Sequence, residues 1–377
     1  MFGKRVKLFE LFGFEVRLDA SWLIIALLVT WSLAAGVFPY LYPGLARDTY
    51  WTMGVIGALG LFISIIAHEF SHSLVARRYG MHIKGITLFV FGGVAEMGDE
   101  PPTARAEFMM AIVGPLSSIA IGAVFYLIYL YGESIGWSTP VNAVIFYIAY
   151  INGILAAFNL LPAFPLDGGR VLRSILWGFK GNLRWATRVS AATGSAFALA
   201  LMFLGVLQFI GGNIIGGAWM FLIGMFLRNA AQMSYQQLLV RKALEGEPVR
   251  RFMIAAPVTV PGSITVEQLV EDYIFRYQHR MYPVLDGEEL LGCVTTRQVK
   301  DIPREAWGRQ TVREAVIPCS PENSVPPNLD AIQALAKMQQ NGISRMLVVE
   351  NGRLAGLITL KDLLNFFSLK VELEERD

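Results

Sequence analysis

Long apolar segments separated by short polar connections fill the chain up to about residue 240. A helix that crosses a bilayer needs about 20 predominantly apolar residues. Six segments come close to this length or exceed it, so the pattern predicts six membrane-spanning helices. They cover Ser21–Phe38, Met53–Ala76, Phe108–Tyr131, Val141–Leu161, Ala186–Ile210 and Ile214–Leu227. The last segment is short, and only Gly211–Asn213 separates it from the one before.

The positively charged residues of the connections indicate how these helices are oriented. Lysine and arginine gather before the first segment, between the second and third, between the fourth and fifth, and after the sixth; the alternate connections contain only Arg47. Because basic connections stay on the cytoplasmic side, we expect a multi-pass protein of the cell membrane with both termini in the cytoplasm. The basic start at Lys4–Lys7 resembles a signal peptide, but the first apolar run continues to Phe38, which favours a retained span.

The connection after the second apolar segment is unusual because it is itself apolar. Ile83–Met97 is rich in β-branched and aromatic residues and is interrupted by Gly92 and Gly93, a pattern that predicts a β-hairpin. Two placements are open at this point. The hairpin lies on the protein surface, or it enters the membrane beside the second helix, where protein groups or water must satisfy its backbone.

The composition changes beyond a helical connector at about Ser234–Leu244. Tyr282–Thr295 realigns on Met346–Thr359, so Val249–Leu369 contains an internal repeat. Each copy has two strands flanked by helices, which are expected at Thr265–Tyr277 and Thr296–Asp301 in the first copy and at Leu329–Asn341 and Lys361–Phe367 in the second. Two such units bury their apolar faces by packing on each other.

The fold class that follows is an α-helical polytopic membrane domain joined to an α/β domain. The first contains about six transmembrane helices and a membrane-associated β-hairpin, and the second is a tandem repeat. We expect the membrane domain at residues 1–235, a linker at 236–248, and the two copies of the repeat at 249–307 and 308–377.

The overall composition agrees with this division and excludes one class of partner. The 377 residues are 54% hydrophobic and only 16% charged, well below the charge of a typical soluble protein. The net charge of +2 gives no reason to expect nucleic-acid binding. Cys293 and Cys319 both lie in the polar C-terminal part and suit a reducing compartment.

The second apolar segment contains the most informative residues, His68-Glu69-Phe70-Ser71-His72. An ionised group near the centre of a bilayer costs roughly 2.5–3.5 kcal/mol or more, so a chain that keeps one there is expected to use it. His68 and His72 are one helical turn apart and present both imidazoles on one face, where they can bind one metal ion. Glu69 can act on a water molecule held by that ion. The motif therefore indicates a zinc hydrolase site within the membrane.

A catalytic zinc site needs a third protein ligand and an open position for water. Asp167 is the best candidate, because it lies in Asn159–Arg170, where prolines break the helix and glycines allow close approach. The same aspartate is alternatively a helix cap. Of the remaining histidines, His82 approaches the site only if the chain turns back, and we expect neither it nor His279 to bind a metal.

The residues of this site suit the hydrolysis of a peptide bond. Zinc lowers the pKa of a bound water molecule to about 7. Glu69 can then take the proton as a general base and deliver it to the leaving amine. Asn159 either hydrogen-bonds the peptide or the developing oxyanion, or satisfies carbonyl groups freed by the helix break near Pro162.

The chain resembles the site-2 protease family of intramembrane zinc metalloproteases, in its branch with appended CBS (cystathionine β-synthase) domains. The resemblance rests on HEFSH in a membrane helix, on NLLPAFPLDGG further along, and on the C-terminal repeat. It implies that His68, His72 and Asp167 bind one Zn²⁺, that Glu69 is catalytic, and that Asn159 assists substrate binding. The family also has an apolar hairpin near the active site, thought to receive the substrate as an added strand, which Ile83–Met97 matches. Its substrates are membrane proteins cleaved in or near a transmembrane segment.

The repeat resembles a CBS pair, and such pairs often bind adenine nucleotides and associate further. The resemblance implies ATP or AMP as a ligand and a homodimer formed through these domains. The ribose-binding signature of the family, Gly-x-x-Thr/Ser-x-x-Asp, is present in the second copy as Gly356, Thr359 and Asp362. The first copy has Gln298 in place of the aspartate, so one of the two nucleotide sites departs from the pattern.

Two other functions fit parts of the sequence. A transporter or channel gated by the CBS pair requires an aqueous path lined by polar groups, and the first, third, fifth and sixth spans offer few. Two histidines and a carboxylate also resemble the ligand set of a non-haem iron oxygenase. Glu69 has no necessary role in that chemistry, and the chain has only four histidines. The zinc protease accounts for more of the residues than either alternative.

Overall fold

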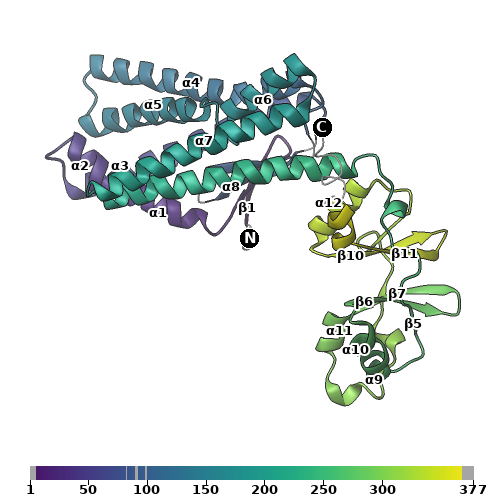
Figure 1. Cartoon of the computed structure of the whole chain (residues 1–377). Coiled ribbons are helices and arrows are strands. Elements are labelled where there is room, and N and C mark those ends of the chain that lie inside the picture. Colours follow the sequence, from purple (N-terminus) through teal and green to yellow (C-terminus); the bar gives the residue numbers. More distant parts are fainter. Residues whose placement is uncertain (1–5, 82, 90–91, 98–99, 367–377) are drawn as a thin grey trace. The chain divides into compact units, whose positions relative to one another are not determined.

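The computed structural model describes residues 6–81, 83–89, 92–97 and 100–366. The chain divides into two compact units, Met1–Tyr235 and Gln236–Asp377. The first contains the apolar segments and the second contains the repeat, and each is described by itself below (Figure 1).

The first unit contains the six predicted spanning helices. Within the described residues, six helices are long and apolar enough to cross a membrane. They are Trp22–Leu41 (α1 Trp22–Ser32, a π-helical turn η1 Leu33–Val37, and α2 Phe38–Leu41), α3 Arg47–Arg78, α4 Ala104–Ser134, α5 Thr139–Asn159, α7 Leu183–Ile210 and α8 Ile214–Leu244. The chain is therefore a multi-pass membrane protein, and the cytoplasmic placement of its termini stays a prediction.

The sixth span is longer than its apolar run indicates. α8 is one continuous helix that includes both the apolar segment ending at Leu227 and the separate connector predicted at Ser234–Leu244. The residues between them include Arg228, Asn229 and Gln232 but no proline or glycine. Polar residues end a hydrophobic run without ending a helix, since most of them have adequate helix propensity.

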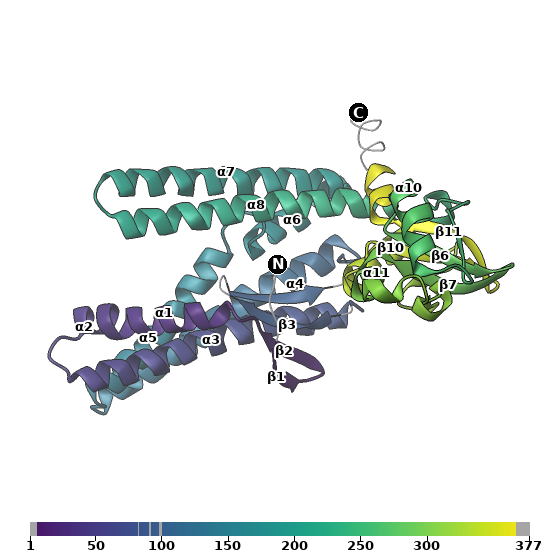
Figure 2. The same cartoon turned by 90° about the horizontal axis from the view of Figure 1, so that it is seen from below.

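Helix α3 lies at the centre of the unit, where it contacts α1, α4 and α5. α4 and α5 form an antiparallel pair, and α7 and α8 form another, as both views show (Figures 1 and 2). The second pair approaches closely through small residues: a Cβ on Gly205 would lie 2.7 Å from the carbonyl oxygen of Gly217. Small residues at such crossings allow dispersion contacts between backbones where lipid supplies no hydrophobic driving force.

A four-stranded sheet covers part of α3. Its strands are β1 Val6–Leu11, β2 Phe14–Leu18, β3 Ile83–Phe89 and β4 Gly92–Met97, in the order β1-β2-β3-β4. β3 and β4 are antiparallel, which confirms the predicted hairpin, and β2 runs parallel to β3. The sheet therefore joins the start of the chain to the segment that follows α3.

The N-terminal hairpin of β1 and β2 was not predicted. Its signal is the alternation of charged residues with apolar ones on both strands, around a two-residue turn in which Phe12 and Gly13 have φ of 50° and 83°. The hairpin packs on α3 through Phe14, whose ring meets that of Phe70 edge to face at 5.6 Å. Arg77 adds a hydrogen bond from its guanidinium to the carbonyl oxygen of Phe12 at 2.8 Å. The middle residue of HEFSH thus holds the hairpin against the motif helix.

A short amphipathic helix, α6 Asp167–Lys180, lies between the fourth and fifth spans. Gly168 and Gly169 fold tightly against the turn that precedes it, because a Cβ on either would lie within 2.3 Å of the backbone of Leu160 or Phe164. α7 closes on the same turn, since a Cβ on Gly194 would lie 2.0 Å from the carbonyl oxygen of Phe164. The glycines therefore fix where α6 begins.

The second unit confirms the internal repeat. In the first copy its elements are β5 Val260–Pro261, α9 Val266–Gln268, η3 Leu269–Ile274, α10 Phe275–Tyr277, β6 Met281–Asp286, β7 Glu289–Thr295 and α11 Thr296–Asp301. β8 Ile317–Pro318 follows and pairs with β7. In the second copy they are β9 Ser324–Val325, α12 Ala331–Asn341, β10 Arg345–Glu350, β11 Arg353–Thr359 and a helix at 360–366. Short helical turns lie at Val249–Arg251 (η2), Arg304–Ala306 (η4) and Val312–Ala315 (η5).

The two copies agree in detail at their central hairpins. β6 pairs with β7 and β10 with β11 in the same register, and each pairing has a bulge after the equivalent valine, Val284 or Val348. Met281 and Cys293 of the first copy pack with Leu347 and Leu357 of the second in one buried cluster. The two copies therefore bury apolar residues against each other, as the sequence predicts. The predicted fold class, a helical membrane domain with an α/β repeat pair, is confirmed.

We expect Gly194→Ala to destabilise the membrane domain. The added methyl overlaps the backbone at Phe164, and overpacking of this kind costs about 1–3 kcal/mol. Gly153→Ala is the matched control, because nothing lies within 4 Å of a Cβ at that helical position. The thermal midpoint of the purified protein in detergent should fall for Gly194→Ala only. Equal midpoints for the two variants would contradict the close contact of α7 with the turn.

Candidate metal centre

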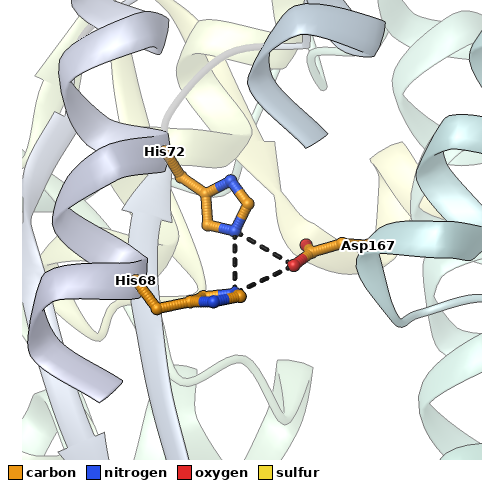
Figure 3. A group of neighbouring side chains, drawn as sticks. All are labelled: His68, His72 and Asp167. Atoms are coloured by element: carbon orange, nitrogen blue, oxygen red, sulfur yellow. Dashed lines mark hydrogen bonds and ion pairs between the residues drawn. The ribbon is translucent and has the colours of Figure 1, made fainter. Parts of the chain in front are cut away.

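His68 and His72 lie one turn apart on α3 and are both almost fully buried. Their Nε2 atoms are 3.2 Å apart. The rings are nearly perpendicular and direct these nitrogens to the same side of the helix, as predicted from their spacing (Figure 3).

Asp167 approaches the two histidines from the opposite side. Its Oδ2 lies 3.0 Å from Nε2 of His68 and 3.1 Å from Nε2 of His72. The aspartate is the first residue of α6, and Leu166 occupies the cap position, so its carboxylate faces the imidazoles (Figure 3). The structure therefore brings together the three residues that the sequence singled out as metal ligands, from positions 99 residues apart along the chain.

The hydrogen bond that each histidine makes through Nδ1 determines whether its Nε2 can accept a metal ion or a proton. Nδ1 of His72 is 2.6 Å from the carbonyl oxygen of Met110, which can only accept, so this nitrogen carries the proton. Nδ1 of His68 is 2.9 Å from Oγ of Ser118 and donates to it in the equivalent tautomer. Nε2 of His72 then carries a lone pair, and so does Nε2 of His68 when its Nδ1 donates to Ser118. Both nitrogens face Oδ2 of Asp167.

This donor set fits Zn²⁺. Two imidazole nitrogens and one carboxylate oxygen are typical ligands of a catalytic zinc site. Tetrahedral ligands at zinc distances stand about 3.3 Å from one another, close to the separations observed here. Three acceptor atoms so near one another repel unless a cation or a proton lies between them. We call the cluster formed by His68, His72 and Asp167 the metal centre, as a candidate site for one metal ion.

Helix α4 supports the metal centre with one face. Met110, Gly114 and Ser118 follow one another at intervals of four residues and so lie on one side of the helix. A Cβ on Gly114 would lie only 2.2 Å from Nε2 of His72 and 2.7 Å from Nε2 of His68. In sequence, a glycine followed by a proline within a helix, Gly114-Pro115, indicates a kink or a close-packing point. The contact is indeed close packing, but its partners are the two imidazoles.

Glu69 lies between the histidines in sequence, and β4 passes directly over it. A Cβ on Gly93 would come within 2.8 Å of Cγ of Glu69. The predicted hairpin therefore touches the predicted general base, and only a glycine allows this approach.

Asn159 is the last residue of α5 and is partly buried. Its Nδ2 donates to the carbonyl oxygen of Leu155, one turn earlier, at 2.9 Å. This carbonyl group lies within α5, so the bond is local to the helix, and both predicted roles of Asn159, satisfying carbonyls freed near Pro162 and binding substrate, stay predictions. His82 lies outside the described residues. His279 is exposed in the second unit, beside Tyr277.

An apolar pocket of about 340 Å³ adjoins the metal centre. It is lined by residues of α1, α3 and α8, among them Trp22, Ile65 and Trp219. Its lining also includes Leu166, which precedes Asp167, and Leu88, which lies close to Gly93. The pocket therefore lies among helices of the membrane domain and includes the residue that precedes Asp167.

A second pocket, of about 700 Å³, lies between the two copies of the repeat. Thr359 and Asp362, the predicted nucleotide-binding residues, are both in its wall, together with Arg345 and Lys361. Oγ1 of Thr359 donates to Oδ2 of Asp362 at 2.6 Å, so the pair also caps the helix at 360–366. Burial and the neighbouring Arg280 lower the pKa of Arg345. Two guanidinium groups close together favour a bound anion.

Comparison with known proteins identifies both parts of the chain. Residues 56–136 and 132–204 match the model of peptidase family M50, and residues 249–304 and 312–369 match the CBS domain. The candidate zinc metalloprotease Rip3 of Mycobacterium tuberculosis is 35% identical over 352 residues, which are 93% of this chain and 89% of Rip3. This chain belongs to peptidase family M50.

Two further relatives extend the comparison. Zinc metalloprotease MJ0392 of Methanocaldococcus jannaschii is 29% identical over 372 residues, which cover 98% of each chain. The solved site-2 protease of the same organism is 29% identical, with a TM-score of 0.44 over 61% of this chain and 94% of that one. Membership of the M50 family and similarity to zinc metalloproteases imply Zn²⁺ as the metal.

We expect Gly114→Ala to abolish metal binding. The methyl would occupy the space in front of both Nε2 atoms, where a metal ion must lie. Zinc content of the purified variant, measured by mass spectrometry after dialysis against buffered Zn²⁺, should fall to background. Gly153→Ala should bind as much zinc as the natural protein. Full zinc occupancy in Gly114→Ala would show that the ion lies elsewhere.

Proposed function

We propose that this M50 peptidase is an intramembrane zinc protease that hydrolyses peptide bonds in or near transmembrane segments of other membrane proteins. The observation that carries the proposal is the convergence of His68, His72 and Asp167 beside Glu69, inside a helical membrane domain. Three acceptor groups buried together repel one another unless a cation or a proton lies between them.

The chemistry is divided between the metal and the chain. Zinc bound at the metal centre would polarise a water molecule and the scissile carbonyl group. Glu69, on the turn of α3 that carries both histidines, accepts the proton of that water and then delivers it to the leaving amine. Ser118 and the carbonyl group of Met110 hold the imidazoles in the required tautomer and orientation. Asn159 is proposed to bind the substrate backbone, for which its amide must turn away from Leu155.

The position of β4 supports substrate binding by strand addition. Among the described residues β4 pairs only with β3, so its other edge is open to a further strand. An extended peptide that pairs with this edge would gain main-chain hydrogen bonds in a membrane, where unpaired groups are costly. It would also pass close to Glu69, because Gly93 of β4 packs on that side chain. The apolar pocket beside Leu166 then receives side chains of the unwound segment.

We expect Glu69→Gln to lose cleavage and to keep zinc. A positioned general base contributes about 10²–10⁴-fold to a rate, and the amide cannot accept the proton, whereas the three ligands are unchanged. The measurement is cleavage of a panel of tagged single-span substrates in proteoliposomes, with zinc content determined on the same samples.

Ser71→Ala is the matched control in the same motif. Ser71 donates only to the carbonyl oxygen of Ala67, within its own helix, and its loss should leave cleavage unchanged. Equal cleavage by the natural protein and Glu69→Gln would remove Glu69 as the base. Ion flux that persists in Glu69→Gln, with no cleavage by either protein, would favour the alternative of a CBS-gated transporter.

We further propose that an adenine nucleotide, ATP or AMP, binds between the CBS copies and regulates the protease, and that these domains support a homodimer. The pocket combines a carboxylate for ribose hydroxyls, Asp362, with cationic groups for phosphate, Arg345 and Lys361. The first copy offers no equivalent carboxylate: Gln298 occupies the matching position, and its Nε2 donates to the carbonyl oxygen of Ala315. One nucleotide per chain is therefore expected. Regulation requires that the two activity states bind the nucleotide with different affinity.

We expect Asp362→Asn to weaken ATP binding about tenfold or more. A hydrogen bond to a charged group is worth about 1.5–3 kcal/mol, and asparagine keeps an oxygen that can still cap the helix. The control is Gln298→Ala, at the equivalent position of the other copy, which should bind ATP as the natural protein does. Isothermal titration of the full chain with ATP, and separately with AMP, gives the affinities. Unchanged binding by Asp362→Asn would place the nucleotide elsewhere.

A further inference from the structure

One ion pair is buried in the membrane domain outside the metal centre. Glu107 of α4 is fully buried, and Arg173 of α6 is 5% exposed. Nε of Arg173 donates to Oε1 of Glu107 at 2.5 Å, and a second guanidinium nitrogen contacts the same oxygen. Glu100 lies further away, with its Oε2 3.5 Å from the guanidinium. The pair therefore joins α4 directly to α6.

The two residues are close in sequence to the parts that build the metal centre. Arg173 is six residues after Asp167 on the same helix. Glu107 precedes Met110, Gly114 and Ser118 on α4 and continues the face that holds the two histidines. The ion pair thus connects the helix that supplies the third ligand to the helix that orients the other two.

Stability alone is a poor reason to keep this pair. Burying two charges is expensive, and replacing such a pair with apolar residues of similar volume is often neutral or stabilising. The cost is increased here because Oε2 of Glu107 is buried and has no partner within the described part of the chain. The planar guanidinium of Arg173, however, places two of its nitrogens on one oxygen of Glu107. Such a contact restricts the orientation of the two side chains as well as their distance, which apolar contacts do not.

α6 needs such a directional contact. It has only 14 residues and begins at the ligand itself, so a rotation or shift of the helix moves the carboxylate directly. The guanidinium of Arg173 also stacks over the ring of Phe164, 5.1 Å from its centroid, in the turn that leads into Asp167. Metal ligands must be held within about 0.5 Å of their working geometry.

We propose that Glu107 and Arg173 are positioning residues for Asp167. Their ion pair sets the rotation and height of α6 on α4, so that the carboxylate stands between the two Nε2 atoms. The inference deepens the proposed function, because it rests on metal binding by His68, His72 and Asp167.

The test measures Zn²⁺ affinity of the full chain in lipid nanodiscs, by competition with a chelator of known affinity. The variants are Glu107→Gln, Arg173→Lys and the apolar pair Glu107→Leu with Arg173→Met. Loss of a group that orients a ligand typically weakens metal binding by about 10–100-fold, and we expect this range for all three. Ser174→Ala is the control: Ser174 is the buried neighbour of Arg173, bonds only within α6, and should leave the affinity unchanged.

Two further readouts separate positioning from folding. The thermal midpoint of the zinc-free protein should be kept in the apolar pair, so that its weaker zinc binding does not reflect unfolding. In an Asp167→Asn background, Glu107→Gln should cause no additional loss of affinity, because it acts through the carboxylate that is already gone.

The outcomes are distinct. Zinc affinity within twofold of the natural protein in Glu107→Gln and in the apolar pair would overturn the positioning role while leaving the protease proposal intact. An equal loss in the presence and absence of the Asp167 carboxylate would also overturn it. If the natural chain binds no zinc, both this inference and the proposed function fail.

Discussion

The structure of the membrane domain depends on one electrostatic constraint, the convergence of three electron-pair donors within 3.2 Å of one another. Such a cluster is stable only around a cation or a shared proton, and in a low-dielectric environment the requirement is strict. Each donor must therefore be held by a second interaction that does not involve the others. α3 supplies two donors, α6 supplies the third, and α4 touches all of the elements that carry them.

One face of α4 makes the contacts that orient both imidazoles and the contact that joins α4 to α6. Three residues of α4 face the two imidazoles. Met110 offers its carbonyl group, Ser118 offers its hydroxyl group, and Gly114 leaves room because it has no side chain. Glu107, a turn earlier, extends this face towards α6. A helix normally presents side chains to its neighbours, but here its most important residue is the one without a side chain. The face acts as a template against which the ligands are arranged.

The sequence was sufficient for the elements that have a periodic or local signal. The spans, the apolar hairpin and the repeat each follow from hydrophobic patterning. The motifs HEFSH and PLDGG contain the three residues, His68, His72 and Asp167, that lie together in the structure. The N-terminal hairpin was missed because its basic residues lie where a topology signal is expected. Ser118, Glu107 and Arg173 have no local signature, since their importance depends on which helices become neighbours. α8 exceeded its predicted length because a change from apolar to polar residues does not break a helix.

The order of the segments in the sheet and the metal centre has a consequence for biosynthesis. β2 pairs with β3, about 70 residues later, so the N-terminal hairpin cannot join its sheet until α3 has been made. Asp167 follows His68 by 99 residues, with two complete spans between them. A nascent chain therefore carries Glu69 and both histidines through the membrane-insertion machinery without its third ligand. The cluster of three donors is completed only after α6 has been synthesised, so every shorter nascent chain lacks the carboxylate of Asp167.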